Sequence, residues 1–276
     1  DLGHEAILLF GTFTAQIGDP SGRDERRKPL TPEEVEKNMA DYQKQVSKVL
    51  DFSKVKIKRN GDWLAKLTFS DVSELASRFT VPRIMERDMF QERIKKGEDI
   101  WLNEFLYPLM QGYDSVAMDV DLEIGGNDQT FNMLAGRKLQ KDINKKEKFV
   151  LTTPMLVGLD GRKMSKTFGN TVNIADEPGE MYGKIMSLKD ELIIPYFQIC
   201  TDIASKEIAV IEKELKTGKM NPRNAKADLA GEIVKMYHGQ SAAKTATVEF
   251  DRVFKEKKLP QDISKIAIKE KEMPIL

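Results

Sequence analysis

Cysteine and histidine are scarce in this sequence of 276 residues, which contains only Cys200, His4 and His238. A single cysteine cannot build a disulfide framework, and so few thiols and imidazoles argue against a zinc site with Cys and His ligands. A reducing, cytoplasmic environment is therefore expected, and no set of metal ligands can be recognised.

Long apolar runs are also missing. No stretch of 18 apolar residues and no secretory leader is present, which argues against membrane-spanning and secreted proteins. Lys plus Arg and Asp plus Glu both number 44, so the formal net charge is zero. Any contact with nucleic acid must therefore use a local basic patch rather than a global positive field.

What the sequence does contain is an alternation of short apolar strands and amphipathic helices. Residues 5–13 (EAILLFGTF) are typical of a buried parallel strand. Thr31, Pro32 and Glu34 form a capping box that predicts a helix start. The segment 54–64 (KVKIKRNGDWL) then alternates like a strand and ends in an Asn-Gly turn.

The alternation continues through the middle of the chain. Residues 101–118 predict a long helix that contains Pro108, and 121–126 (DLEIGG) predict a strand that ends in a glycine turn. A helix over 127–143 and a buried strand at 148–156 follow. This order is typical of the α/β class, with a Rossmann-like parallel sheet.

Beyond about residue 170 the strand pattern ends and amphipathic helices dominate. We predict a Rossmann-like catalytic domain over 1–172, with a helical insertion at about 30–105. An all-α domain over 173–260 and a charged linker over 261–276 complete the predicted organisation.

The first chemical motif is a lysine loop, GRKMSKTFGN, at residues 161–170. Lys163 and Lys166 flank Ser165, Thr167 follows, and glycines stand at both ends, so the loop can move and close on a polyphosphate. A bare pair of lysines at this spacing is usually a solvated basic loop, but the whole string after a buried strand is much more specific.

Glycines also mark the end of the strand at 121–126. Gly126 and Asp128 lie between this strand and a helix, where the backbone can approach a sugar or phosphate and the carboxylate can accept from ribose hydroxyls. The same residues are equally compatible with a simple helix cap after a tight turn.

Tyr107, Gln111 and Asp114 stand at positions i, i+4 and i+7 of the predicted long helix, on one face. Buried polar groups must be paired, and a ligand carrying an amine and a hydroxyl would satisfy them. The alternative is a polar face in water. Asp19, just beyond the first strand, could hold an ammonium group or simply form a turn with Pro20.

Taken in order, FTAQIGDPSGR, FLYPLMQGYD, GGNDQTFN and GRKMSKT resemble the bacterial tyrosyl-tRNA synthetases, which are class I aminoacyl-tRNA synthetases. The lysine loop resembles the KMSKS signature of that class, with Thr167 in the final position. The resemblance covers most of residues 3–260. It implies ATP-dependent activation of L-tyrosine to tyrosyl-adenylate, followed by transfer to tRNA(Tyr).

The resemblance also implies roles for the amino-acid site. Asp114 would accept a hydrogen bond from the phenol hydroxyl, Thr14 would line the ring, and Gln129 would lie near the substrate carboxylate and the α-phosphate. The α-ammonium group would be bound by Asp19, Tyr107 and Gln111.

For the nucleotide, the resemblance implies that Gly126 and Asp128 hold the ribose. The lysine loop would contact ATP through Lys163, Met164, Ser165 and Lys166. Its catalytic group would consist of Lys163, Lys166 and Thr167, which would meet the departing pyrophosphate. Mg²⁺ is expected with the ATP, without a protein ligand that can be identified.

The same resemblance leads us to expect a His-x-Gly-His segment before Asp1 and an S4-type RNA-binding domain after the linker. We therefore interpret Gly3-His4 as a turn before a core strand, and we expect this chain alone to activate tyrosine poorly. A homodimer is implied through the 70–110 region, where VPRIMERDMF (81–90) carries apolar residues that look exposed.

Two other functions stay open. One is a synthetase for tryptophan or another aromatic amino acid, which Asp114 as a reader of a phenol argues against. The other is a non-catalytic RNA-binding paralogue, for which the lysine loop and the polar helix face would both be unnecessary.

Overall fold

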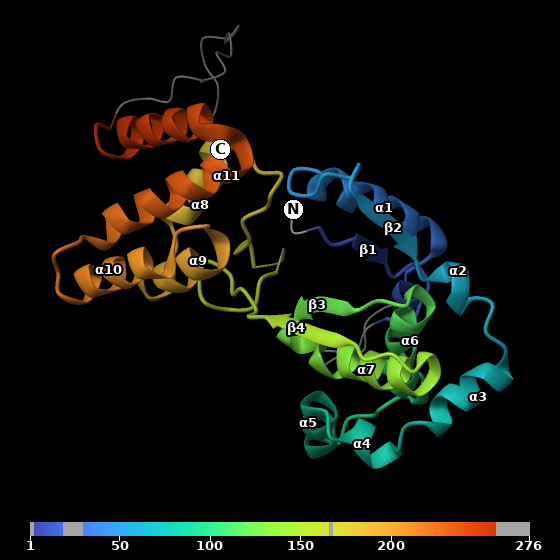
Figure 1. The fold of residues 1–276 in the computed structure, drawn as a ribbon. Coiled ribbons are helices and arrows are strands. Elements are labelled where there is room, and N and C mark those ends of the chain that lie inside the picture. Colours follow the sequence, from blue (N-terminus) through green and yellow to red (C-terminus); the bar gives the residue numbers. More distant parts are fainter. Residues whose placement is uncertain (1–2, 19–29, 166–167, 258–276) are drawn as a thin grey trace, which may run out of the picture. The chain divides into compact units, whose positions relative to one another are not determined.

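The structure is a computed structural model that describes residues 3–18, 30–165 and 168–257. The chain divides into two compact units, Asp1–Met155 and Leu156–Leu276 (Figure 1). The domain limits predicted at 172 and 260 stay a prediction, because both fall inside the second unit.

Four short strands in the first unit form two parallel pairs. In one pair, β1 (Ala6–Phe10) runs beside β2 (Val55–Arg59), and in the other β3 (Leu122–Gly126) runs beside β4 (Phe149–Thr153). Parallel neighbours need a crossover connection. The predicted α/β class with parallel strands is confirmed, although the described strands form two two-stranded sheets rather than one continuous sheet.

The helices of the first unit begin where the sequence supplies caps. Before α1, Glu34 N donates to Thr31 Oγ1 at 3.2 Å and Thr31 N donates to Glu34 Oε2 at 2.8 Å, which is the predicted capping box. The helical elements of this unit are η1 (Thr14–Gln16), α1 (Pro32–Val46), α2 (Gly61–Leu64), α3 (Phe69–Ser77), α4 (Val81–Met85), α5 (Asp88–Lys96), α6 (Leu102–Met118), η2 (Asn127–Gln129) and α7 (Thr130–Asn144).

Helices α6 and α7 pack closely because a glycine of one faces a glycine of the other. A Cβ atom on Gly112 would lie 3.1 Å from Gly136 N, and a Cβ atom on Gly136 would lie 2.6 Å from Ser115 Oγ. Side chains at either position would force the helices apart. Helix α6, which carries the predicted polar face, is therefore held firmly against α7.

An apolar core joins α6 and α7 to the short helices α3, α4 and α5. Its buried members are Leu75, Ile84, Phe90, Leu109, Val116 and Leu139. The predicted exposure of the 81–90 segment is therefore wrong for Ile84 and Phe90, since the short helices α4 and α5 turn these two side chains inward. Val81 does remain exposed.

The second unit is almost entirely helical, as predicted for the C-terminal part of the chain. Its buried core joins side chains from every long helix, including Tyr182, Phe197, Ile208 and Leu229. Its helical elements are α8 (Pro178–Met186), η3 (Asp190–Leu192), α9 (Ile193–Cys200), α10 (Ser205–Lys216) and α11 (Pro222–Phe254). Over the described ranges of both units, no helix combines the length and the apolar character that crossing a bilayer requires.

Helix α11 is broken at Gly239, where φ is 85° and ψ is 166°. This left-handed conformation favours glycine. The two halves run side by side, because Arg223 Nη2 donates to Asp251 Oδ1 at 2.8 Å and because Ala243 and Ala246 enter the same core as Leu229 (Figure 1). Helix α11 is therefore a helical hairpin rather than one continuous rod.

Candidate active site

Tyr107, Gln111 and Asp114 lie on one face of α6, as the spacing predicted. Asp114 is only 3% exposed and Tyr107 is also buried, whereas Gln111 is half-buried. The interpretation of this face as a solvated surface is therefore excluded. Three polar side chains on a buried helix face need polar partners from elsewhere in the unit.

The Asp114 carboxylate is held at both oxygens by residues that follow β2. Trp63 Nε1 donates to Oδ1 at 2.8 Å, and Asn60 Nδ2 donates to Oδ2 at 3.2 Å. Burial nevertheless dominates and raises the pKa of Asp114 to about 7, against the two hydrogen bonds, which lower it. At neutral pH this acid is thus poised between its charged and neutral forms.

Asn60 connects Asp114 to the segment after β1. Its Nδ2 also donates to Thr14 Oγ1 at 3.1 Å, while its Oδ1 accepts from Phe13 N at 2.8 Å. The buried Thr14 thus belongs to the same polar cluster as Asp114. The predicted Asn-Gly turn is instead the entry to α2, since Asn60 has right-handed helical angles.

A second polar chain runs from α6 to the start of α7. The fully buried Asn132 donates through Nδ2 to Gln111 Oε1 and to Gln129 Oε1, both at 3.0 Å. Gln129 Nε2 in turn donates to Asp128 Oδ2 at 3.3 Å. The structure therefore brings Gln111, Gln129 and Asp128 together through a residue that sequence reasoning did not identify.

Gly126 ends β3, two residues before Asp128. A Cβ atom at Gly126 would come within 2.7 Å of Asp128 Oδ1, so glycine leaves room for this carboxylate to fold back over the strand end. Asp128 itself is exposed and available to a ligand. Asp128 is not a helix cap, because the N-cap residues of η2 and α7 are Gly126 and Gln129, and neither forms a side-chain cap.

The lysine loop lies in the second unit, where Asn170 holds its base. Asn170 Nδ2 donates to Asp160 Oδ1 at 2.8 Å and to Lys163 O at 3.1 Å, and its Oδ1 accepts from Ser165 N at 2.9 Å. The hydrogen bond from Asn170 is the largest of the interactions that lower the pKa of Asp160.

These contacts leave the Lys163 side chain on an exposed stretch, next to the half-buried Met164 and Ser165. Three predicted site residues, Asp19, Lys166 and Thr167, lie outside the described residues.

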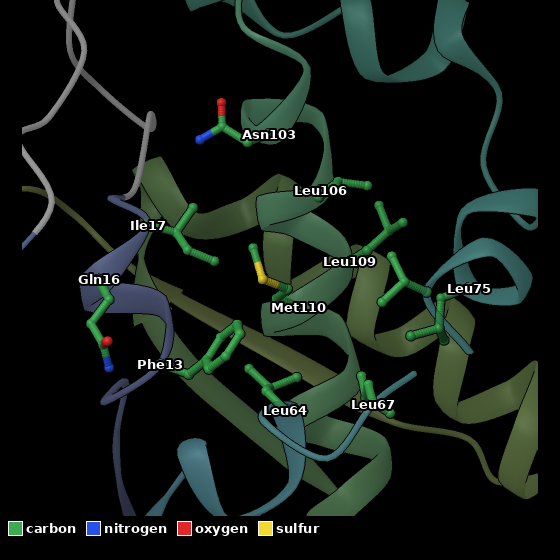
Figure 2. A pocket seen from close by; sticks show the side chains of 11 residues that line it. Phe13, Gln16, Ile17, Leu64, Leu67, Leu75, Asn103, Leu106, Leu109 and Met110 are labelled. Atoms are coloured by element: carbon green, nitrogen blue, oxygen red, sulfur yellow. The ribbon is translucent and has the colours of Figure 1, made fainter. Parts of the chain in front are cut away.

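An apolar pocket of about 360 Å³ lies on another flank of α6 (Figure 2). Phe13, Leu64, Leu106 and Met110 are among its lining residues, and none of the eleven carries a charge. It could not hold a carboxylate, an ammonium group and a triphosphate. The polar face of α6 is the better candidate for an active site, and Phe13 and Thr14 mark the boundary between the two.

Among the residues that the structure describes, no group of three or more His, Cys, Asp and Glu side chains could hold a metal ion.

Comparison with known proteins gives one consistent match. Residues 1–255 match the family described as tRNA synthetases class I (W and Y). The tyrosine–tRNA ligase of Carboxydothermus hydrogenoformans is 50% identical over 263 residues, which are 95% of this chain and 64% of that protein. That of Thermotoga maritima is 48% identical over 269 residues, which are 97% of this chain and 67% of that protein. The chain thus spans about two thirds of the length of these relatives.

Solved structures share the fold at low sequence identity. A tyrosyl-tRNA synthetase of Archaeoglobus fulgidus, complexed with L-tyrosine, matches 89% of this chain and 81% of its own, with a TM-score of 0.65 and 23% identity. A C-terminally truncated mitochondrial tyrosyl-tRNA synthetase of Aspergillus nidulans matches 90% of this chain and 76% of its own, with a TM-score of 0.68 and 21% identity.

Proposed function

Because this chain belongs to the tRNA synthetases class I (W and Y), we propose that it carries the activating site of a tyrosine–tRNA ligase. The overall reaction is ATP-dependent formation of tyrosyl-adenylate from L-tyrosine and transfer of the tyrosyl group to tRNA(Tyr). The observation that carries the choice of tyrosine is Asp114. It is a buried carboxylate whose two oxygens both accept hydrogen bonds. It lies on the same helix face as the amide of Gln111 and the phenol of Tyr107.

Asp114 accepts the hydrogen bond of the substrate hydroxyl, with Thr14 beside the ring. Trp63 and Asn60 keep the carboxylate from turning away when no ligand is present. An analogue that lacks the hydroxyl is bound less tightly, because it covers this buried carboxylate without donating to the lone pair that remains beside the bonds from Trp63 and Asn60. This favours tyrosine over phenylalanine. It also argues against tryptophan, whose indole has no hydroxyl at this position.

The amino-acid backbone of the substrate meets the second polar chain. Tyr107 and Gln111 bind the α-ammonium group together with Asp19, and Gln129 lies near the carboxylate and the α-phosphate. Asp128, with Gly126, binds the adenosine ribose. The linkage of Gln111, Gln129 and Asp128 through Asn132 supports a shared site for the amino acid and the nucleotide.

Activation is a displacement at phosphorus. A carboxylate oxygen of tyrosine attacks the α-phosphorus of ATP, the bond from that phosphorus to the bridging oxygen breaks, and pyrophosphate leaves with the bond electrons. A ribose hydroxyl at the 3′ end of the tRNA then attacks the acyl carbon, and AMP leaves. Such chemistry depends on alignment and on charge stabilisation more than on acid–base groups.

Stabilising the departing charge is the role we assign to the lysine loop. Lys163 and Lys166 provide compact positive charges, and Ser165 and Thr167 provide hydroxyl donors near the phosphates. Met164 contributes backbone contacts to ATP. Mg²⁺ would bind the phosphate oxygens of ATP, which are its usual ligands, and no step is assigned to a protein–metal contact.

The assembly that we propose is a cytoplasmic homodimer that binds tRNA(Tyr). Large apolar side chains remain exposed in the region implied for the dimer, among them Val81, Ile94 and Leu102, the last 76% exposed. Exposed apolar side chains of this size are typical of a protein interface when they form a contiguous patch. Sedimentation of the purified chain, and of a Leu102→Glu variant, tests the dimer.

Calorimetric binding of tyrosine and phenylalanine to Asp114→Ala tests the proposed function. We expect tyrosine affinity to fall about tenfold to hundredfold, as for loss of a charged buried hydrogen bond, and phenylalanine affinity to change less than about threefold. Asp62→Ala, which removes an exposed acid beside Trp63, is the matched control and should change neither affinity. Equal losses for both ligands, or no tyrosine binding by the unaltered chain, would contradict the proposal.

A further inference from the structure

Lys148, the residue before β4, has a side chain with no exposed surface. Lysine is almost never fully buried unless it is paired. Its ammonium group forms an ion pair with Glu123 Oε2, and it donates to Ser115 Oγ at 2.6 Å and to Met133 O at 3.2 Å. Three acceptors thus match the three N–H bonds of the ammonium group.

The ammonium group of Lys148 lies at the contact between α6 and α7, next to Ser115 and Gly136. A Cβ atom at Gly136 would lie 2.7 Å from Lys148 Nζ, so only glycine at this position lets the ammonium group pass. Ser115, which accepts from Lys148, stands on α6 next to Asp114 and donates to Glu123 Oε2 at 3.2 Å. The ion pair therefore lies directly behind the polar face of α6.

Glu123 connects Lys148 to Gln111 in the candidate site. Its other oxygen, Oε1, accepts from Gln111 Nε2 at 3.5 Å. A carboxylate can only accept, so the end of the Gln111 amide that faces it must be the NH₂ group. At the opposite end, Asn132 Nδ2 donates to Gln111 Oε1.

The two contacts select one orientation of the Gln111 amide. In the flipped orientation a carbonyl oxygen would face the Glu123 carboxylate, and an NH₂ group would face the NH₂ group of Asn132. Both contacts would be repulsive and would leave buried polar groups unpaired. In the selected orientation, Gln111 Oε1 keeps one lone pair beyond the bond from Asn132.

We propose that the buried Lys148–Glu123 ion pair is a positioning element of the amino-acid site. Lys148 fixes Glu123, and Glu123 with Asn132 fixes the Gln111 amide so that its carbonyl oxygen is offered to an ammonium group. This inference rests on the proposed function for the identity of the ligand. The orientation of Gln111 in the free protein does not depend on it.

A contribution to stability does not by itself explain why an ion pair is buried at this place. Removing two charges from water costs about as much as their attraction returns, and apolar residues of similar volume often serve equally well. A geometric requirement explains better why a lysine and a glutamate are placed behind a polar helix face. Neither residue is expected to touch the substrate.

The decisive ligands are tyrosine and 3-(4-hydroxyphenyl)propionate, which is tyrosine without its amino group. For Glu123→Ala we expect the affinity for tyrosine to fall about tenfold, while the affinity for the propionate changes less than about twofold. Glu123→Gln places one oxygen and one NH₂ group where the carboxylate has two oxygens, so only one of the donors Gln111 Nε2 and Lys148 Nζ keeps its acceptor. Its tyrosine affinity should therefore fall less than that of Glu123→Ala, by about threefold.

Arg93→Met is the matched control. It breaks another buried ion pair of the same unit, Arg93–Glu104, whose Glu104 also stands on α6. This variant should therefore lose stability but keep the orientation of the Gln111 amide, so its affinities for both ligands should be unchanged. Equal weakening of tyrosine and of the propionate by Glu123→Ala would show a purely structural role and would overturn the proposal.

A measurement on the ligand-free full chain decides the inference independently. The side-chain amide protons of Gln111, assigned by NMR, should shift or broaden in Glu123→Ala and in Lys148→Met, but not in Arg93→Met. Unchanged Gln111 resonances would refute the positioning role even if tyrosine binds well. If the unaltered chain binds neither ligand, the proposed function is wrong, and these resonances still decide whether Glu123 orients Gln111.

Discussion

Raising the pH from 5 to 8 should destabilise the first unit through Asp114. In the folded chain, burial raises the pKa of this acid from its ordinary value of 3.8 to about 7. Between these two values, the folded state holds a proton that the unfolded state has already released. Stability therefore falls as the pH rises through this window, and the loss ends above the folded pKa, where both states are ionised.

The size of the effect follows from the two pKa values. The full difference corresponds to about 4 kcal/mol of unfolding free energy, of which about 2.5 kcal/mol falls between pH 5 and pH 8. Because Asp114 is almost fully buried, solvent screening reduces this figure little. The value is a substantial fraction of the usual stability of a domain, which is about 5–15 kcal/mol.

Asp114→Asn supplies the reference for this measurement. Every other titrating group is shared by the two proteins, so the difference between their stabilities isolates Asp114. The variant also carries a loss of about 1–3 kcal/mol that does not depend on pH, because one of the two donors, Trp63 Nε1 or Asn60 Nδ2, then faces its amide nitrogen. That loss is a constant offset and does not change the slope with pH.

Urea unfolding followed by tryptophan fluorescence measures the stability of the right part of the molecule. Both tryptophans, Trp63 and Trp101, belong to the first unit. From pH 5 to pH 8 the unaltered chain should lose about 2.5 kcal/mol relative to Asp114→Asn. If the two stability curves stay parallel within about 0.5 kcal/mol, the carboxyl ionises near its ordinary pKa in the folded chain and the reasoning is refuted.

Two further predictions concern packing and the lysine loop. Gly136→Ala should lower the stability of the first unit by about 1–3 kcal/mol, because the new Cβ atom would collide with Ser115 Oγ. The control is Gly231→Ala on α11, where a Cβ atom would meet open space, and it should be neutral or stabilising. Thermal unfolding followed by circular dichroism measures both variants. Asn170→Ala should speed tryptic cleavage after Lys163 about fivefold, because it removes the hydrogen bonds that hold the base of the lysine loop. Asn173→Ala is the control. Unchanged cleavage in Asn170→Ala would mean that other contacts hold the loop.

The polar face of α6 could be predicted from sequence because it depends only on spacing along one helix. Tyr107, Gln111 and Asp114 share a face whenever the segment is helical, and local patterns of the same kind predicted the capping box at Thr31. The parallel pairing of the strands also followed from local alternation of strand and helix. These features need no knowledge of which distant segments meet.

The partners of that face could not be predicted, because they come from distant segments. Trp63 and Asn60 stand 51 and 54 residues before Asp114, and in the sequence they looked like a strand end and a turn. In the sequence, Lys148 is only the first residue of the predicted strand at 148–156, and no local pattern points to its partners. Only the fold reveals that its ammonium group is buried against Glu123, 25 residues away.

Exposure was also misjudged where helices are very short. In the 81–90 segment, a period of 3.6 residues has too few turns to separate inner from outer positions. Ile84 and Phe90 therefore looked as exposed as Val81, although α4 and α5 bury them.

The segment that forms α11 has two possible arrangements, a hairpin and a straight helix, and Gly239 decides between them. In an unbroken helix Arg223 and Asp251 would stand about 42 Å apart, and their present contact exists only because Gly239 reverses the chain. A residue that resists the left-handed conformation would favour the straight form, whose second half could then fill the vacated place in another molecule's core. Gly239 thereby keeps the second half of α11 in the core of its own chain, whereas a straight helix could exchange that half between two molecules.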